Sequence, residues 1–425
     1  MPAYPFELYL ALRYLRPKRT LVSHITLISV IGVMLGVAVL IIVMSVMSGF
    51  DADLRQRILG FNAHLKIFYF NAPMPDYNLL AERVRTHPRV KAAAPFVVGQ
   101  VLVKTQPEEG SPRTMGPWVL GVDETLEAKI SVLPERIAEG KFEMGQEGVL
   151  FGQVLAEQMR VEVEDYVAIY SIPVLESMLA SLEQGEEIAV LPDDFEVKGI
   201  FDVGYYEYNE RFIICSLATA QSFFGLAEKD LVHGLRVILD EPEAAASVRL
   251  ELRHLLGTRY RIMTWMEENS GILEALIVEK NVMFYLLFFI MIVAAFGIAS
   301  GQITFVVQKT REIGMLKAMG ASNGQIMWVF LSQSLVVGLV GVAAGLCLGL
   351  LAVHYRNPFL FFMRNQTGWE LFPDDVYGFS ELPALVVPGD ITLICGGSLL
   401  ICLMAGLIPS CNASRLHPVE ALRHE

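Results

Sequence analysis

The chain contains four long runs without Asp, Glu, Lys or Arg, at residues 21–50, 281–308, 318–355 and 391–414. Roughly 20 apolar helical residues cross the hydrocarbon of a bilayer, so each run is long enough for one span. No comparable run lies between residues 51 and 280. The pattern therefore predicts an α-helical membrane protein with four transmembrane helices, at 21–50, 281–308, 326–353 and 384–410.

Residues 51–275, between the first two predicted spans, alternate between short strand-like and short helical patterns, as in an α+β domain. Strand-like runs at 64–70 and 97–104 enclose a helical pattern at 77–86, and the same order returns at 232–239, 241–256 and 259–264. Two β-α-β units at the two ends of one domain predict a split ferredoxin-like layer. Short apolar runs from about 115 to 215 predict a β-rich subdomain inserted between them.

The basic residues beside the spans predict the orientation. Residues 1–20 carry Arg13, Arg16, Lys18 and Arg19 against Glu7, and residues 309–317 carry Lys309, Arg311 and Lys317 against Glu312. Because Lys and Arg concentrate in cytosolic loops, both chain ends are predicted in the cytosol, and residues 51–275 and the loop at 354–383 outside it. The formal net charge is −13, and residues 51–280 alone carry −15. The outer domain is therefore acidic.

The two ends of the chain complete this organisation. Residues 1–20 mix apolar and basic positions, which predicts an amphipathic cytosolic segment along the inner surface, with a frayed tail as the alternative. The first uncharged run is too long for a cleaved signal core, so we expect a retained anchor. Residues 411–425 are predicted as a cytosolic tail.

Candidate catalytic chemistry is mostly missing. The sequence has no G-x-x-x-x-G-K-[ST] phosphate loop, no metal-binding histidine or cysteine pattern and no G-x-S-x-G elbow. The uncharged runs disfavour ion-coupled transport, which commonly uses charged groups within the membrane. Only Cys215 of the five cysteines lies in the outer domain, so no disulfide can form within it. We therefore predict no enzymatic activity, catalytic residue, metal or cofactor in this chain, and a separate ATPase as its energy source.

The connection at residues 309–325 is a candidate contact with such an ATPase. Ile313, Leu316 and Lys317 have helical spacing, and Gly320 follows as a stop signal. A short helix on the cytosolic face is therefore predicted. It is either a docking helix or an ordinary basic connector.

A second candidate contact is the acidic excursion at residues 172–192. Leu175, Met178 and Leu182 have helical spacing beside Glu183. A long loop that is both acidic and partly apolar is typical of a partner-binding segment. The alternative is a solvated loop whose short helix packs on its own domain.

Small residues recur at four-residue spacing in three spans. The pairs or triplets are Gly32 and Gly36, Gly297 and Gly301, and Gly341, Gly345 and Gly349. Helices in lipid approach closely where such residues share one face, so each set predicts a helix contact, in a tight bundle or a dimer.

Several short stretches together resemble a known family. They are Ser45-Val46-Met47-Ser48-Gly49-Phe50 continuing to Gly60, Glu279-Lys280-Asn281, Arg311-Glu312-Ile313-Gly314, Ala318-Met319-Gly320, Gln325-Ile326-Met327, and the ending from Pro409-Ser410 to Arg423. They are similar to the lipoprotein-releasing permeases of Gram-negative bacteria, the LolC/LolE type. The stretches after the second span are also typical of the wider class that includes the macrolide-exporter and cell-division permeases.

The resemblance implies an inner-membrane ABC transporter, with residues 51–275 as a periplasmic domain. Such a complex pairs the chain with a second permease, homologous or identical, and with two copies of an ATPase that uses ATP and magnesium. It extracts lipoproteins from the outer leaflet of the inner membrane and passes them to a periplasmic carrier by mechanotransmission. Lipoprotein cargo and membrane lipid are the expected ligands, and no nucleic acid is expected.

The resemblance also assigns candidate site residues. The coupling segment at 309–325 would contact the ATPase through Arg311, Glu312, Gly314, Leu316, Lys317 and Gly320. The lipid cavity would be lined by Val43, Met44, Met47 and Phe50, for which helix packing is the alternative. The carrier-binding loop would use Pro173, Leu175, Met178, Leu182 and Glu183.

Two other functions fit the same pattern. One is a permease-like regulator that transmits ATPase movement to a periplasmic cell-wall enzyme. The other is a tripartite efflux permease for small molecules, which is disfavoured because such permeases commonly carry their ATPase on the same chain.

Overall fold

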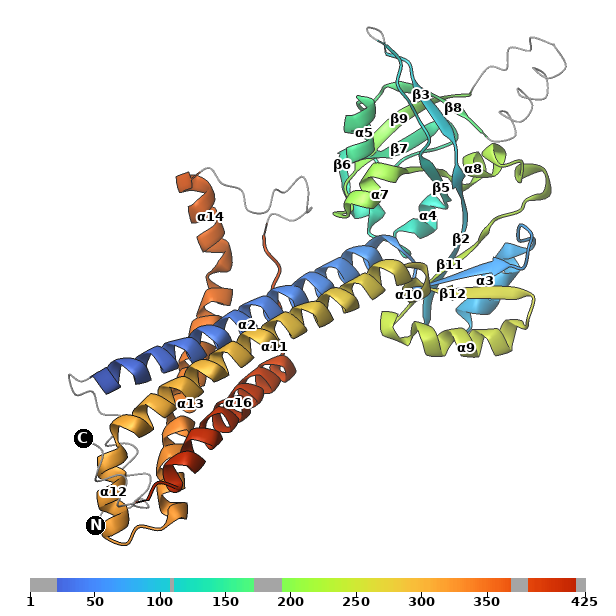
Figure 1. Ribbon diagram of the computed structural model, residues 1–425. Coiled ribbons are helices and arrows are strands. Elements are labelled where there is room, and N and C mark those ends of the chain that lie inside the picture. The colour runs from blue at the N-terminus through green and yellow to red at the C-terminus, as the bar shows by residue number, and fades with distance from the viewer. Residues whose placement is uncertain (1–20, 108–110, 172–192, 368–380, 418–425) are drawn as a thin grey trace, which may run out of the picture. The chain divides into compact units, whose positions relative to one another are not determined.

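The computed structural model describes residues 21–107, 111–171, 193–367 and 381–417, in two compact units. The helical unit contains residues 21–53, 274–367 and 381–417, and the sheet unit contains residues 54–107, 111–171 and 193–273 (Figure 1). The carrier-binding residues expected at 173–183 lie outside the described residues.

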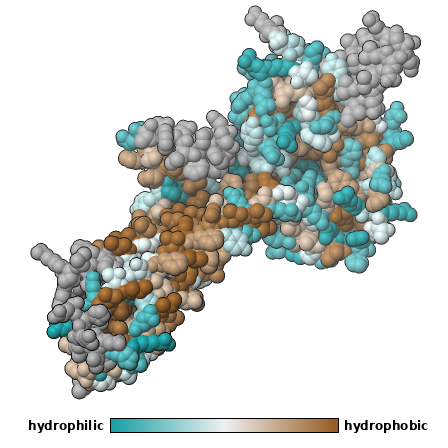
Figure 2. Space-filling model, in the orientation of Figure 1, coloured by the Kyte–Doolittle hydropathy of each residue, from teal (hydrophilic) through white to brown (hydrophobic). Residues whose placement is uncertain are grey.

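In its described residues, the helical unit contains six helices. They are α2 (Leu21–Phe61, which continues into the sheet unit), α11 (Ser270–Gln308), α12 (Thr310–Ala318), α13 (Asn323–His354), α14 (Arg356–Thr367) and α16 (Pro388–Ser414). Within the described residues, α2, α11, α13 and α16 are long and apolar enough to cross a membrane, which confirms the prediction of four apolar helices. Figure 2 shows hydrophobic residues gathered along these long helices.

The helix α14 lies in the segment that the sequence analysis describes as a loop, 354–383. Its sequence, Arg-Asn-Pro-Phe-Leu-Phe-Phe-Met-Arg-Asn-Gln-Thr, is too short to span a membrane and follows directly on α13. The side chain of Arg356 donates to the carbonyl oxygens of Leu382 (2.5 Å) and Val353 (3.0 Å). Those two contacts fix the start of α14 to the chain on either side.

Glycine contacts distinguish the three small-residue sets. A Cβ at Gly341 or Gly345 would lie 2.8 Å from Val33 or Val37 of α2, and one at Gly349 would lie 3.0 Å from Ile41. The set in α13 therefore forms a close contact with α2. By contrast, nothing comes within 4 Å of a Cβ at Gly32 or Gly297, so neither position forms a close contact with another described residue.

We expect Gly345→Val to destabilise the helical unit and Gly297→Val to be tolerated. The new side chain at 345 would meet the carbonyl oxygen of Met34 at 2.7 Å, and overpacking of this kind costs about 1–3 kcal/mol. Thermal unfolding of the two variants in the same detergent measures the difference. Equal melting temperatures would contradict the assignment of the α13 contact.

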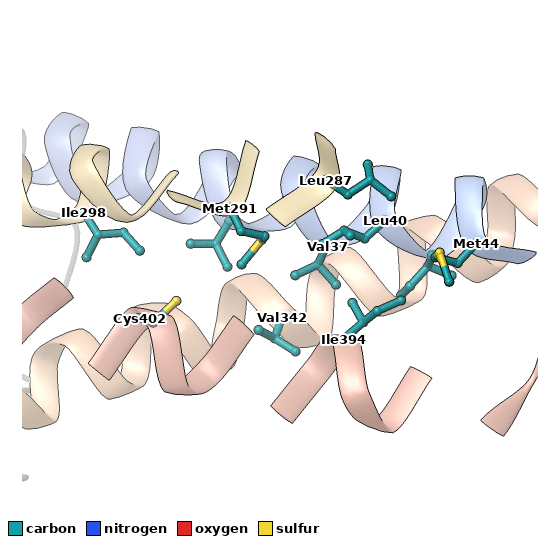
Figure 3. Packing of buried hydrophobic residues seen from close by; sticks show 11 residues of the cluster. Val37, Leu40, Met44, Leu287, Met291, Ile298, Val342, Ile394 and Cys402 are labelled. Atoms are coloured by element: carbon teal, nitrogen blue, oxygen red, sulfur yellow. The ribbon is translucent and has the colours of Figure 1, made fainter. Parts of the chain in front are cut away.

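The apolar core of the helical unit collects side chains from all four long helices (Figure 3). Val37, Leu40 and Met44 come from α2, Leu287, Met291 and Ile298 from α11, Val342 from α13, and Ile394 and Cys402 from α16. Because all four long helices contribute side chains to it, this cluster is the apolar core around which they pack.

The sheet unit contains one mixed sheet. Its strands are β1 (Leu65–Tyr69), β2 (Val90–Gln100), β3 (Leu102–Thr105), β4 (Thr114–Met115), β5 (Trp118–Val122), β6 (Ile137–Gly140), β7 (Gly148–Gly152), β8 (Tyr166–Tyr170), β9 (Asp193–Phe201), β10 (Phe212–Ser216), β11 (Gly234–Leu239) and β12 (Tyr260–Thr264). The order is β12-β1-β11-β2-β5-β10-β7-β9-β8-β3-β4, and β6 pairs with β9.

The neighbours β12-β1-β11-β2 come from both ends of this segment of the chain and pair antiparallel. The helices α3 (Tyr77–Arg85) and α9 (Ala245–Leu256) have their main contacts with β2 and β12. The strand β2 begins at Val90, whereas the sequence analysis places a strand at 97–104. Its first half, with Ala92 to Ala94 and Pro95, has weak strand propensity, but burial of the small alanines within the layer outweighs that preference.

The remaining short helices of the sheet unit connect its strands. They are α4 (Glu124–Glu127), α5 (Gln153–Met159), α7 (Tyr206–Arg211), α8 (Leu217–Phe223) and α10 (Trp265–Glu268), with 3₁₀ turns at Leu133–Glu135, Ala227–Lys229 and Pro242–Ala244. A buried apolar cluster joins Phe61, Phe96 and Phe201 to side chains of β5, β7 and β10.

Two histidines in this unit, the buried His64 and the half-buried His233, have structural roles. Nδ1 of His64 accepts a hydrogen bond from the Leu239 amide (3.0 Å), and Nδ1 of His233 accepts one from the Val98 amide (3.1 Å). Burial lowers the pKa of both rings, which favours the neutral form that can accept.

No group of three or more His, Cys, Asp or Glu side chains in the described residues could hold a metal ion.

Candidate functional site

The short helix α12 is packed into the end of the bundle at which α11 ends and α13 begins. Its Ile313 is buried with Phe305 of α11, Phe330 of α13 and Ala413 of α16, and Leu316 packs against the same cluster. The chain then turns at Gly320, whose φ of +100° favours glycine. Ser322 caps α13 in a capping box with Gln325. These contacts hold α12 on three long helices at once.

Lys317 ties α12 to the end of α16. Its Nζ donates hydrogen bonds to the carbonyl oxygens of Ser414 (2.6 Å) and Leu416 (2.8 Å). The last carbonyl groups of a helix have no partner within the helix and carry partial negative charge, so an ammonium group there is doubly favourable. Lys317 therefore stabilises the packing of α12 against the end of α16.

The six coupling residues expected from the sequence fall into different environments. Arg311 and Gly320 are exposed, Gly314 is buried, and Glu312, Leu316 and Lys317 are half-buried. Nζ of Lys309 lies 2.5 Å from Oε1 of Glu312. The structure brings the six together on one short segment, but only Arg311 and Gly320 are well exposed to a partner.

Two exposed methionines beside α12 are not among the six expected coupling residues. Met315 is 46% exposed and Met319 is 77% exposed, and both follow Arg311 at intervals of four residues. Residues spaced by four lie on one face of a helix, so Arg311 and Met315 lie on the outer face of α12, and Met319, the residue that follows the helix, extends it. We call these three residues the outer face of α12. That spacing is visible in the sequence, but its significance depends on knowing which side is covered.

The four expected lipid-cavity residues lie along the second half of the apolar part of α2. Met44 is buried in the core cluster, Val43 packs against that cluster, and Met47 and Phe50 are half-buried. Helix packing therefore accounts for Met44 in this structure. Met47 and Phe50 keep part of their surface available.

A separate apolar cavity of about 310 Å³ lies between α2, α11 and α16. Its lining residues are Leu40, Phe284, Phe288, Met291, Leu393, Ile394, Gly397, Ser398, Leu400 and Ile401. Ligand pockets in proteins occupy about 300–1,000 Å³, and a wall that is almost wholly apolar selects hydrocarbon. The sequence pattern does not reveal this cavity, because every span is apolar on all sides.

The stretch Ser45 to Phe50 has a definite packing role. The backbone amide of Leu385 donates to the carbonyl oxygen of Ser45 (2.8 Å), and a Cβ at Gly49 would overlap the backbone of Ala384. Ser48 Oγ also lies 3.4 Å from Oδ2 of Asp390. The glycine permits the segment before α16 to cross α2 at close range.

The expected carrier-binding segment, 172–192, joins β8 to β9. These strands are antiparallel neighbours, with Ile169 opposite Asp193. Pro173, Leu175, Met178, Leu182 and Glu183 lie outside the described residues. In the sequence, they lie between β8 and β9.

Comparison with known proteins gives two family matches and a set of full-length relatives. Residues 26–255 match the MacB-like periplasmic core domain, and residues 284–418 match the FtsX-like permease C-terminal domain. The lipoprotein-releasing system transmembrane protein LolC of Xylella fastidiosa (strain Temecula1) is 31% identical over 99% of both chains. LolC of Neisseria meningitidis is 30% identical over 99% of this chain and 100% of its own, and LolE of Haemophilus influenzae is 29% identical over 97% and 98%.

Proposed function

Because the chain belongs to the LolC and LolE family of lipoprotein-releasing system transmembrane proteins, we propose that it is a permease subunit of an ATP-driven lipoprotein-releasing ABC transporter in the bacterial inner membrane. The similarity over nearly the full length of both chains carries this proposal. The match of residues 26–255 to a periplasmic core domain supports a periplasmic position for the sheet unit.

The proposed reaction cycle begins with a lipoprotein in the outer leaflet of the inner membrane. The permease pair takes up its lipid anchor, and ATP hydrolysis by two copies of a partner ATPase drives its transfer to a periplasmic carrier. Both chain ends and α12 lie in the cytosol in this proposal, in agreement with the basic residues in these segments. The second permease is homologous or identical.

The outer face of α12 is the proposed ATPase contact. Two exposed methionines beside an arginine offer apolar area with adaptable shape and a charged group at its edge. Because Ile313 and Lys317 join α12 to α11, α13 and α16, a force on the outer face reaches these helices directly. That arrangement supports transmission of movement through the membrane.

The apolar cavity between α2, α11 and α16 is the proposed contact for an acyl chain of the cargo. Its walls carry Leu40, Phe288 and Met291, and burial of apolar surface favours a hydrocarbon chain there. Met47 and Phe50 remain candidates for contacts nearer the outer end of α2.

The sheet unit is the proposed carrier-facing part. We interpret β12-β1-β11-β2 with α3 and α9 as the split ferredoxin-like layer and β3 to β10 as the β-rich subdomain. Residues 172–192, which leave β8 and return to β9, are the proposed carrier-binding loop.

Depletion of the chain from a Gram-negative host tests the function. We expect outer-membrane lipoproteins to accumulate in the inner membrane, and purification of the chain from native membranes to recover an ABC ATPase. A defect limited to cell-wall cleavage, with normal lipoprotein sorting, would instead support a regulator of a periplasmic enzyme.

We expect the double variant Met315→Asp/Met319→Asp to lower lipoprotein release by at least about tenfold while the chain remains folded. Both positions are exposed, so the new carboxylates should not destabilise the folded chain. They should destabilise only the proposed ATPase contact, where an unpaired buried charge is costly. Release from proteoliposomes and co-purification of the ATPase measure the effect. Normal release would remove the outer face of α12 from the proposal.

Gly314→Asp provides an informative comparison for that experiment. Gly314 is buried, so a carboxylate there disrupts the packing of α12 on its own bundle. We expect this variant to lower the melting temperature of the isolated permease, which the double variant at 315 and 319 leaves unchanged.

A further inference from the structure

The helix α14 directly follows α13 and has no buried side chain between residues 356 and 366 (Figure 1). Phe359, Phe361 and Phe362 are 59%, 46% and 61% exposed. Twelve residues are too few to cross a bilayer, and transfer of large aromatic side chains out of water is favourable. The exposed aromatic side chains therefore favour a partly apolar environment for α14.

Polar contacts hold α14 to the segment that precedes α16. Oδ1 of Asn357 accepts a hydrogen bond from the Leu382 amide (3.1 Å), and its Nδ2 donates to Oε2 of Glu381 (3.1 Å). Phe359 and Phe362 lie about 160° and about 140° from Asn357 around the helix, so both point away from residues 381–382. A helix in water has the opposite arrangement, with its apolar side toward the protein.

The segment bound by α14 lies at the level where the uncharged part of α2 ends. The amide of Leu385 donates to the carbonyl oxygen of Ser45 (2.8 Å), and the next charged residue of α2 is Asp51. In the first turn of α16, Oδ2 of Asp390 lies 3.4 Å from Ser48 Oγ. Because charged groups are costly in hydrocarbon, the hydrocarbon around these spans ends near this level. The first turns of α14 therefore lie at a membrane surface.

The charge of α14 is complementary to lipid phosphate groups. The helix carries Arg356 and Arg364 and no acidic residue. Helices with basic residues on one side and Phe or Leu on the other bind at the boundary between headgroups and acyl chains. Tyr355, just before α14, is 55% exposed, and tyrosine is enriched at the same boundary.

We propose that the first turns of α14 are inserted among the phospholipid headgroups at the outer end of α13, with Phe359 and Phe362 against acyl chains. Arg356 and Arg364 lie near the lipid phosphate groups. Through Asn357, this anchor also holds the segment before α16 at the depth of the headgroups. The anchor requires α13 to be a membrane span, but it does not depend on the transported cargo, so it goes beyond the proposed function.

Photo-crosslinking in nanodiscs of phosphatidylethanolamine and phosphatidylglycerol tests this contact in the full-length permease. Phe359 or Phe362 is replaced by p-benzoylphenylalanine, and mass spectrometry identifies the molecule to which the ketone has bonded. We expect phospholipid adducts at both positions, at least about half as abundant as at Phe296, a 72% exposed residue of α11. Leu250, a 54% exposed residue of α9, should give at least about fivefold fewer.

The molecule that is captured decides between lipid and protein. Adducts mainly with other residues of this chain would show that the chain itself covers Phe359 and Phe362. Adducts mainly with a second protein would show a protein interface. Either result would overturn the lipid contact.

The double variant Phe359→Ser/Phe362→Ser provides a second measurement. Without its apolar side chains α14 loses the anchor, so we expect its amides to exchange hydrogen at least about fivefold faster in the same nanodiscs. The matched control is Asn365→Ser/Gln366→Ser, at two exposed polar positions of the same helix, which should leave this exchange unchanged. Unchanged exchange in α13 shows that the bundle remains folded in both variants. Equal exchange of α14 in the two variants would contradict the anchor.

Discussion

Glu127→Ala is expected to lower the free energy of unfolding of the sheet unit by about 3–5 kcal/mol. Glu127 in α4 and Arg236 in β11 form an ion pair in which the two side chains are 1% and 2% exposed. Ser131 Oγ donates to the same carboxylate (2.6 Å), whereas Nε of Arg236 has no partner in the described residues. Removing the carboxylate leaves a buried guanidinium group without its counter-charge, which explains the large loss.

Hydrogen exchange of the amides in β2 and β11 measures this loss in the full-length permease. Amides in core strands exchange only when the unit unfolds to a large extent, so their exchange reports its free energy of unfolding. Glu135→Ala, at an exposed site, should change the free energy of opening by less than about 0.5 kcal/mol. The double variant Glu127→Leu/Arg236→Met should recover most of the stability, because it removes both charges. A loss below 1 kcal/mol for Glu127→Ala alone would contradict the importance of the pair.

Gly49→Val is also expected to lower the free energy of unfolding, by an amount at the upper end of the range of about 1–3 kcal/mol for overpacking. The new side chain would overlap the backbone of Ala384, which cannot move aside as a flexible side chain can. The hydrogen bond from the Leu385 amide to Ser45 should break as the segment before α16 is displaced. Faster hydrogen exchange of that amide, together with a lower melting temperature, measures the displacement.

Gly32→Val is the matched control for this variant. It makes the same substitution in the same helix, where nothing among the described residues lies within 4 Å of the new Cβ. We expect its melting temperature to stay within about 1 °C of the original value. If Gly49→Val behaved in the same way, the close crossing of α2 by residues 384–385 would be wrong.

The four apolar helices could be predicted because exclusion of charge over about 20 residues is a one-dimensional signal. The helix at α12 could be predicted from local spacing and from the stop at Gly320. Its exposed face could not, because coverage depends on Phe305, Phe330 and Ala413, which come from three separate helices. Lys317 is one of the expected coupling residues, and the sequence does not show that its Nζ also donates to the carbonyl oxygens of Ser414 and Leu416.

Other features depended on contacts that the sequence pattern does not contain. Spacing alone does not separate Gly345, which contacts α2, from Gly297, which has no such neighbour in the described parts of the chain. The apolar cavity arises where helices distant in sequence meet. The first half of β2 was missed because alanine and proline are weak strand formers, and the layer into which they pack is formed by strands from the far end of the domain.

The two hydrogen bonds of Lys317 limit how α12 can move. A short helix joined only by its flanking turns could swing as a free arm and absorb a displacement without passing it on. Here the last turn of α16 and the packed ends of α11 and α13 must follow α12 or release it. The smallest rigid group at this end is therefore a block of several helices. The stiffness of this block, rather than the flexibility of one connector, determines how far a displacement of α12 is transmitted.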